Sequence, residues 1–222
     1  LGGMTSYLFP FLQSTISVFA GIILVFFIAI YIGVSPQTYH GGLVRLFPKK
    51  DREKAGEVLS ITATVLRRWL VTQLIAMVVI GVVTTIALTI LDVRAAFALG
   101  LIAGLLEFVP TVGPLLSAVP AIAMGLLDSP EKALIVALLY MGIQFAENHL
   151  LIPLLMSEGL DLPPALTIVA QALMALIFGF IGLLVAVPLV AALIVPIKLL
   201  YVRGVLGDED VEVFGDEEGD ED

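Results

Sequence analysis

The chain has 222 residues, of which 59% are hydrophobic and 14% are charged, and its mean hydropathy is +1.09. Because soluble domains are roughly 45–50% apolar and about 25% charged, this composition excludes an ordinary soluble domain and predicts an all-α, polytopic helical membrane protein. There is no cysteine and there are only two histidines, His40 and His149, so disulfides and thiolate sites are excluded and we expect no metal and no cofactor.

The formal net charge of −9 comes from the end of the chain. Residues 208–222 hold ten acids and no base, and the remaining chain carries eleven bases and ten acids. Such a segment cannot bury apolar surface, so we predict a disordered acidic tail after a membrane domain at residues 1–207. The chain begins with Leu1 and shows no signal-peptide pattern, and we expect it to be the C-terminal part of a longer protein.

The first predicted span covers residues 17–34, an apolar run of 18 residues that ends at a Ser-Pro pair. Residues 45–68 hold seven of the eleven bases, which predicts a cytoplasmic segment by the positive-inside rule. Within it, residues 51–68 have an apolar stripe at helical spacing, typical of an amphipathic helix. This helix either lies on the membrane or packs against a sister subunit. The bases would face lipid headgroups, so no nucleic-acid binding is predicted. The uncharged run 69–91 is the next span.

A single acid interrupts the next apolar region. Glu107 stands within about thirty otherwise uncharged residues, and the half-helix 95–109 offers only 12 apolar residues before it, too few for a crossing of about 20 residues. Proline and glycine then break the helix, at Pro110, Gly113 and Pro114. A second half-helix is predicted at 112–127. A re-entrant hairpin and a kinked full span both fit this pattern.

The position of Glu107 favours an internal polar pathway. A carboxylate at bilayer depth costs roughly 2.5–3.5 kcal/mol on insertion scales. Broken backbone persists in lipid only where it is buried in protein or lines a wet cavity. We therefore interpret the acid and the break beside it as functional. The alternative is a buried structural Glu that is hydrogen-bonded to a neighbouring helix.

The same order of features recurs in the next helix, predicted at 130–149. It opens with a capping sequence, Asp128-Ser129-Pro130-Glu131, and its end carries polar residues before a proline, at Gln144, Glu147, Asn148 and Pro153. The spacing of the first three places them on one helix face. Two interrupted helices in corresponding positions point to a transporter binding site. Alternatively, Glu147 and His149 lie at an interface and simply face water.

The last apolar region is long enough for two helices, predicted at 163–178 and 182–203, with a turn or kink at Gly179 and Gly182. Gln171 is the longest polar side chain inside the first of them. The bases that follow, Lys198 and Arg203, place the C-terminus in the cytoplasm.

Several of these motifs together resemble the autoinducer-2 exporter family of permeases. The matching pieces are Glu107-Phe-Val-Pro110, Thr111-Val-Gly-Pro114, Gln144-Phe-Ala-Glu147-Asn148, Leu151-Ile-Pro153 and Gly179-Phe-Ile-Gly182-Leu-Leu-Val-Ala-Val-Pro188. The resemblance implies a multi-spanning inner-membrane protein that usually carries two more helices at its N-terminus. It also implies export of the signal molecule autoinducer-2, or exchange of sodium or lithium for protons.

The leading hypothesis is a secondary transporter of a small molecule or ion, not an enzyme, embedded in the lipid bilayer as a homo-oligomer. The expected pathway and coupling residues are Glu107, Pro110, Gly113, Pro114, Gln144, Glu147, Asn148, Pro153 and Gln171. The sequence has no Walker motif, which argues against ATP-driven transport. The alternatives are a membrane scaffold that transports nothing and an intramembrane hydrolase. The hydrolase is disfavoured because H-E-x-x-H and G-x-S-x-G are both absent.

Overall fold

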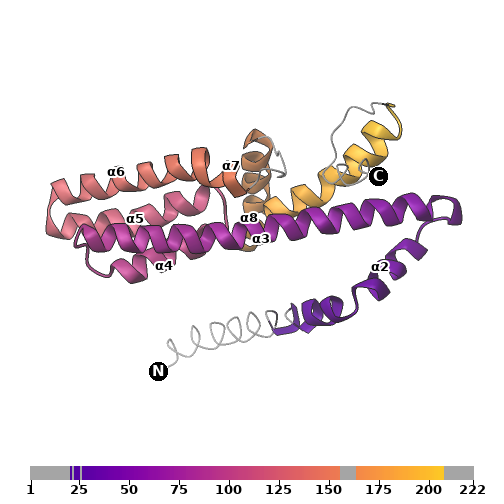
Figure 1. The fold of residues 1–222 in the computed structure, drawn as a ribbon, viewed down its shortest axis with the longest axis horizontal. Helices are drawn as coiled ribbons and strands as arrows, with labels where there is room; N and C mark the ends of the chain where they lie inside the picture. The colour runs from indigo at the N-terminus through magenta and orange to yellow at the C-terminus, as the bar shows by residue number, and fades with distance from the viewer. Residues whose placement is uncertain (1–20, 22, 26, 156–163, 208–222) are drawn as a thin grey trace, which may run out of the picture. The chain divides into compact units, whose positions relative to one another are not determined.

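The computed structural model describes residues 21, 23–25, 27–155 and 164–207 (Figure 1). These residues form helices and no strand, which confirms the predicted all-α class. The chain divides into two compact units, residues 1–59 and 60–222. The predicted acidic tail and residues 17–20 of the first predicted span lie outside the described residues.

The described part of the first unit contains two helices before the start of the long helix α3. A helix over Ile23–Val34 meets α2 (Pro36–Arg45) at a bend of 89°. A 3-10 turn, η1 (Lys49–Asp51), then leads into α3. Arg52 closes this loop, because its Nε donates to the Phe47 carbonyl at 3.1 Å and its Nη2 donates to the Arg45 carbonyl at 3.2 Å.

Helix α3 (Arg52–Ile90) is continuous over 39 residues. The sequence suggested an amphipathic helix at 51–68 followed by a span at 69–91, but no proline separates the two and the structure joins them. In the second unit, α3 carries a buried stripe at helical spacing: Val65, Trp69, Gln73, Ala76, Ile80, Thr84 and Leu88. Because two of these residues are polar, the buried face of α3 brings hydrogen-bonding groups into an otherwise apolar bundle.

Helices α4 (Ala96–Leu106) and α5 (Val112–Asp128) form a re-entrant hairpin. Its two ends meet, since Arg94 Nη2 lies 3.3 Å from Asp128 Oδ1. Lys132 Nζ also donates to the Asp92 carbonyl at 2.6 Å. A kinked full span would separate these ends, so the structure decides between the two alternatives. Eleven helical residues rise about 16 Å, roughly half the thickness of a bilayer core.

Helix α6 (Pro130–Ala146) returns alongside α5 (Figure 1). Its start is capped by Ser129, whose Oγ accepts from the Lys132 backbone N–H at 3.1 Å. A Cβ added at Gly125 would lie only 3.1 Å from the Ala133 Cα, so α5 and α6 are in close contact there. The chain continues through a π-helical turn, η2 (Glu147–Leu151), into the short α7 (Ile152–Leu155).

Helix α8 (Pro164–Pro196) leads into a second π-helical segment, η3 (Ile197–Arg203). Gly179 interrupts α8 with φ +62° and ψ −141°, a conformation that residues with a Cβ rarely adopt. The break lies at the first of the two glycines where the sequence suggested a turn.

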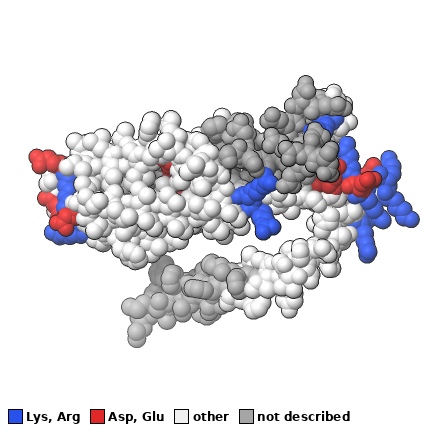
Figure 2. All heavy atoms as spheres, viewed as in Figure 1, with Lys and Arg blue, Asp and Glu red and all other residues white. Residues whose placement is uncertain are grey.

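The helices have the length and surface of membrane spans. Among the described residues, three are long and apolar enough to cross a bilayer, at Lys49–Ile90, Pro130–Leu155 and Ala165–Arg203, and the bent pair near the N-terminus adds a fourth if it counts as one span. In Figure 2 the visible face of α5 and α6 is almost free of charged atoms, whereas charged atoms gather at the turn between these helices and at the start of α3. This distribution supports a multi-pass membrane protein.

Candidate functional site

Two acids are buried together at the tip of the α4–α5 hairpin. Glu107 follows α4 and is 1% exposed, and Glu147 follows α6 and is 6% exposed. Their carboxyl groups lie side by side, and Glu107 Oε2 has no hydrogen-bond partner among the described residues. We refer to these two residues as the carboxyl pair. Gln144 Nε2 donates to Glu147 Oε2 at 3.0 Å. The structure therefore brings three predicted site residues into one buried cluster.

The broken backbone beside the pair is satisfied by glutamines from two other helices. Gln73 of α3 donates from Nε2 to the Glu107 carbonyl at 2.6 Å. Gln171 of α8 donates from Nε2 to the Pro110 carbonyl at 3.1 Å. Carbonyls freed by a helix break in a bilayer need such partners. Gln171 thus belongs to the site, as the sequence suggested, and Gln73 joins it.

The hairpin tip is a tight turn that requires a small residue. Thr111 has φ +72°, and the Gly113 N–H donates to the Val109 carbonyl at 2.8 Å. A Cβ on Gly113 would collide with the Leu106 carbonyl, so this glycine allows the two arms of the hairpin to approach. Pro114 lies in the first turn of α5, and its carbonyl accepts from the Ser117 hydroxyl at 2.9 Å.

Close contact between α3 and α4 fixes the depth of Glu107. A Cβ on Gly104 would lie 2.6 Å from the Met77 carbonyl, and one on Gly100 would collide with the Thr85 hydroxyl. The predicted small-residue pair thus allows α4 to lie directly against α3. At the tip, Trp69 packs edge-on against Phe108 with ring centroids 5.8 Å apart.

Comparison with known proteins identifies the family of the chain. Residues 1–201 match the family described as AI-2E family transporters. The chain belongs to this family. The resemblance inferred from the motifs around the carboxyl pair is therefore confirmed.

Curated relatives of this AI-2E family chain are bacterial. It is 30% identical to YueF of Bacillus subtilis (strain 168) over 77% of its own length and 46% of the relative's. It is 33% identical to the AI-2 transport protein TqsA of Escherichia coli (strain K12) over 61% of its own length and 39% of the relative's. The chain thus spans less than half the length of the curated relatives it matches.

Two predicted site residues are placed away from the buried cluster. Asn148 and Pro153 are exposed, although the spacing of Asn148 suggested that it would share a face with Gln144 and Glu147. Asn148 follows Glu147 by one residue, which places it about 100° round the helix from the buried Glu147, so it falls outside the buried face. The ring of His149 stacks on Phe145 at a centroid distance of 4.1 Å, and its Nδ1 lies 2.9 Å from the Phe145 carbonyl.

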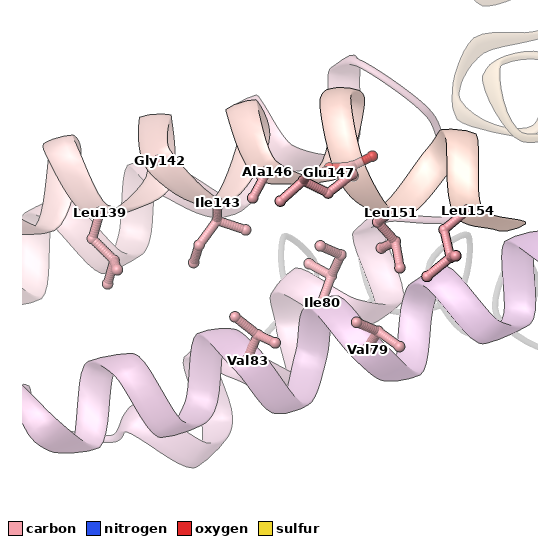
Figure 3. A pocket seen from close by; sticks show the side chains of 11 residues that line it. Val79, Ile80, Val83, Leu139, Gly142, Ile143, Ala146, Glu147, Leu151 and Leu154 are labelled. Carbon is pink, nitrogen blue, oxygen red and sulfur yellow. The ribbon is translucent and has the colours of Figure 1, made fainter.

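An apolar pocket of about 420 Å³ lies between α3 and the end of α6 (Figure 3). Its walls include Val79 and Ile80 of α3 and Ile143 of α6, with Glu147 at its edge. Figure 3 shows the aliphatic side chains facing one another, whereas the Glu147 carboxyl is directed away from Val79 and Ile80. The carboxyl pair therefore lies behind the pocket wall, among the polar groups of the hairpin tip.

The sequence analysis did not single out every polar residue of this region. It assigned no role to Gln73, Ser117 or Tyr140, which are all buried. One sequence signal could have identified two of them. Gln73 lies on the apolar stripe of α3, and Tyr140 precedes Glu147 by two helical turns on the same face. Polar residues on the inward face of a membrane helix are candidate pathway residues.

Proposed function

We propose that this chain is part of a secondary transporter whose coupling ion binds at the carboxyl pair. The carrying observation is the contact between Glu107 and Glu147, two buried acids at a helix break. Like charges side by side in a low-dielectric interior are unfavourable. A proton or a small cation between the two groups removes the repulsion. Because the pair lies at the inner end of a half-length hairpin, its occupancy responds to the ion gradient across the membrane.

The solute pathway surrounds the pair. We propose that it is lined by polar side chains and by broken backbone, at Gln144, Gln171, Pro110, Gly113 and Pro114. The arrangement matches discontinuous transporter helices, whose broken ends bind substrate and ions near the bilayer midplane. The relative TqsA is described as an AI-2 transport protein. The proposed cargo is accordingly a small solute such as autoinducer-2, moved outward.

Exchange of sodium or lithium for protons is the second candidate activity. It is favoured by the same contact, because carboxyl and amide oxygens are suitable ligands for hard cations. The two activities differ in their cargo, and both need the carboxyl pair. A scaffold without transport would leave the acids at the hairpin tip without a role.

The surroundings of the protein follow from its charges. We propose that it lies in the inner membrane with segment 45–68 and the C-terminus in the cytoplasm, because these regions hold most of the bases. We also propose a homo-oligomer, with the apolar stripe at the start of α3 near the subunit boundary. External labelling of Lys50→Cys in intact cells would overturn the orientation, and a wild-type monomer in native mass spectrometry would overturn the oligomer.

Flux into proteoliposomes tests the function. A pH gradient and a sodium gradient are imposed separately, with autoinducer-2, Na⁺ and Li⁺ as the probes. We expect one gradient to drive uptake of one probe by the wild type, and Glu107→Gln to abolish that response. Glu131→Gln is the matched control, because Glu131 is exposed at the start of α6. Probe movement equal to that of protein-free liposomes under both gradients would reject the proposal.

A further inference from the structure

A polar stripe continues along α6 beyond the carboxyl pair. Tyr140, Gln144 and Glu147 follow one another at intervals of four and three residues, so they share a face of α6. Tyr140 is 8% exposed, and its hydroxyl lies beside that of Ser117 on α5. Yet the Tyr140 Oη makes no hydrogen bond to any described residue. The Ser117 hydroxyl is itself buried and donates to the Pro114 carbonyl.

Thr84 of α3 lies at the same depth in the bundle as Tyr140. Lys132 at the start of α6 contacts the Asp92 carbonyl just after the end of α3, and the two helices are antiparallel, so both extend from this anchor to the same side (Figure 1). Thr84 and Tyr140 are each eight residues from it, about 12 Å along either helix. Thr84 is 1% exposed, and its Oγ1 has no hydrogen-bond partner among the described residues.

The behaviour of Thr84 differs from that of neighbouring threonines. Thr85 and Thr89 each donate to the carbonyl four residues earlier, at 2.7 Å in both cases. This is the usual way for a threonine in a membrane helix to satisfy its hydroxyl. The Thr84 hydroxyl instead remains buried and unpaired, which costs free energy unless another partner supplies the bond.

We propose that Thr84, Ser117 and Tyr140 form a hydroxyl station that holds water inside the bundle and extends the polar pathway from the carboxyl pair along α6. A buried water typically makes about three hydrogen bonds to polar groups that otherwise lack partners. Two unpaired hydroxyls from different helices at one depth, with a third beside them, meet this requirement. The role in transport rests on the proposed function, whereas the hydration of the station does not.

An apolar layer closes the station on the side of the charged turn. Leu88, Ala121 and Val136 are fully buried and belong to one packed cluster with Tyr140. Each of them is one helical turn closer to the charged turn at Asp128 and Lys132 than a residue of the station. Leu88 follows Thr84 in this direction, Ala121 follows Ser117, and Val136 follows Tyr140. The station is therefore reached from the carboxyl pair and forms the inner end of the polar pathway in this conformation.

Cysteine reactivity tests the hydration, because the chain has no native cysteine. Ser117→Cys and Ala121→Cys place a thiol one turn apart on the same face of α5. A thiol reacts with a small methanethiosulfonate reagent as the thiolate, which forms in water and not in an apolar layer. We expect Ser117→Cys to be modified at least about tenfold faster than Ala121→Cys, as measured by intact-mass spectrometry. Equal rates would overturn the station.

A second pair of variants covers the case in which Ser117→Cys does not fold. Thr84→Cys and Leu88→Cys make the same comparison on α3, and we expect the same ratio of modification rates.

For the transport role, Tyr140→Phe and Thr84→Val should lower gradient-driven flux severalfold, with Thr89→Val unchanged. Hydrated cysteines with unaltered flux would overturn the pathway role alone. A wild type without flux would reject the proposed function, while the labelling ratio would still decide the hydration.

Discussion

The side chain of Gln73 donates a 2.6 Å hydrogen bond to the main-chain oxygen of Glu107, 34 residues later in the chain. Both residues are buried. The bond ties the middle of α3 to the point where α4 stops, so the acid is held at one depth. Gln171 makes the corresponding bond from α8 to Pro110. The tip of the hairpin is thus fixed by two helices far from it in sequence.

Replacement of Gln73 should therefore destabilise the hairpin tip. Gln73→Leu keeps approximate size but leaves the Glu107 carbonyl without its donor, and a buried unsatisfied group costs about 1–3 kcal/mol. We expect a lower unfolding midpoint in detergent, followed by tryptophan fluorescence, since Trp69 packs at the same tip. Thr89→Val serves as control, because Thr89 is exposed and bonds within its own helix. Equal midpoints for Gln73→Leu and wild type would contradict this assignment.

The glycines of the bundle should differ in their tolerance of a methyl group. A Cβ at Gly113 collides with the Leu106 carbonyl, whereas one at Gly142 meets nothing within 4 Å. We expect Gly113→Ala to destabilise by about 1–3 kcal/mol. Gly142→Ala should be neutral or stabilise by up to about 1 kcal/mol, since alanine is the better helix former. Thermal unfolding of the two variants in one detergent makes the comparison, and equal losses would contradict the close approach at the tip.

The sequence predicted the helix break beside Glu107, because a charged residue and prolines inside an apolar segment are costly in a bilayer unless they serve a structural or functional purpose. It did not decide between a hairpin and a kinked span, since that choice depends on where the ends of the segment lie. The contact of Arg94 with Asp128 decides it. The face predicted for Asn148 was too wide, because Asn148 lies about 100° round the helix from Glu147. Gln73 was overlooked because a lone glutamine in a span has no partner that local sequence can name.

The charged turn below the hairpin should make stability depend on acid pH. The hydrogen bond from Lys132 lowers the pKa of Asp128 below its ordinary value of 3.8. A carboxyl group whose pKa is lower in the folded state contributes stability above its unfolded pKa, and the contribution is lost as the pH falls through the folded value. The midpoint difference between wild type and Asp128→Asn should therefore shrink below about pH 4. A constant difference at all pH values would show that the charge of Asp128 is irrelevant.

The decisive prediction concerns the contact between Glu107 and Glu147. If one proton or cation is bound by both groups, removal of either charge abolishes the ion-binding site. Removal of the second charge then has no further effect on flux. We expect Glu107→Gln and Glu147→Gln each to reduce gradient-driven flux by at least about tenfold. The flux of the double variant should equal that of the less active single variant. Glu107→Asp should retain part of the flux, because only the reach of the carboxyl group is shortened.

The measurement is flux in proteoliposomes at matched protein levels and across a range of pH values. It is made for the wild type, the two single variants and the double variant, which together form a double-mutant cycle. Glu131→Gln controls for the loss of an acid elsewhere on α6, where the side chain is exposed. Losses that multiply in the double variant would mean that the two acids act at separate sites, because independent contributions to one free energy add. Superimposable curves for wild type and Glu107→Gln would make Glu107 a structural residue. The coupling ion would then have to bind without the group that lies deepest in the hairpin.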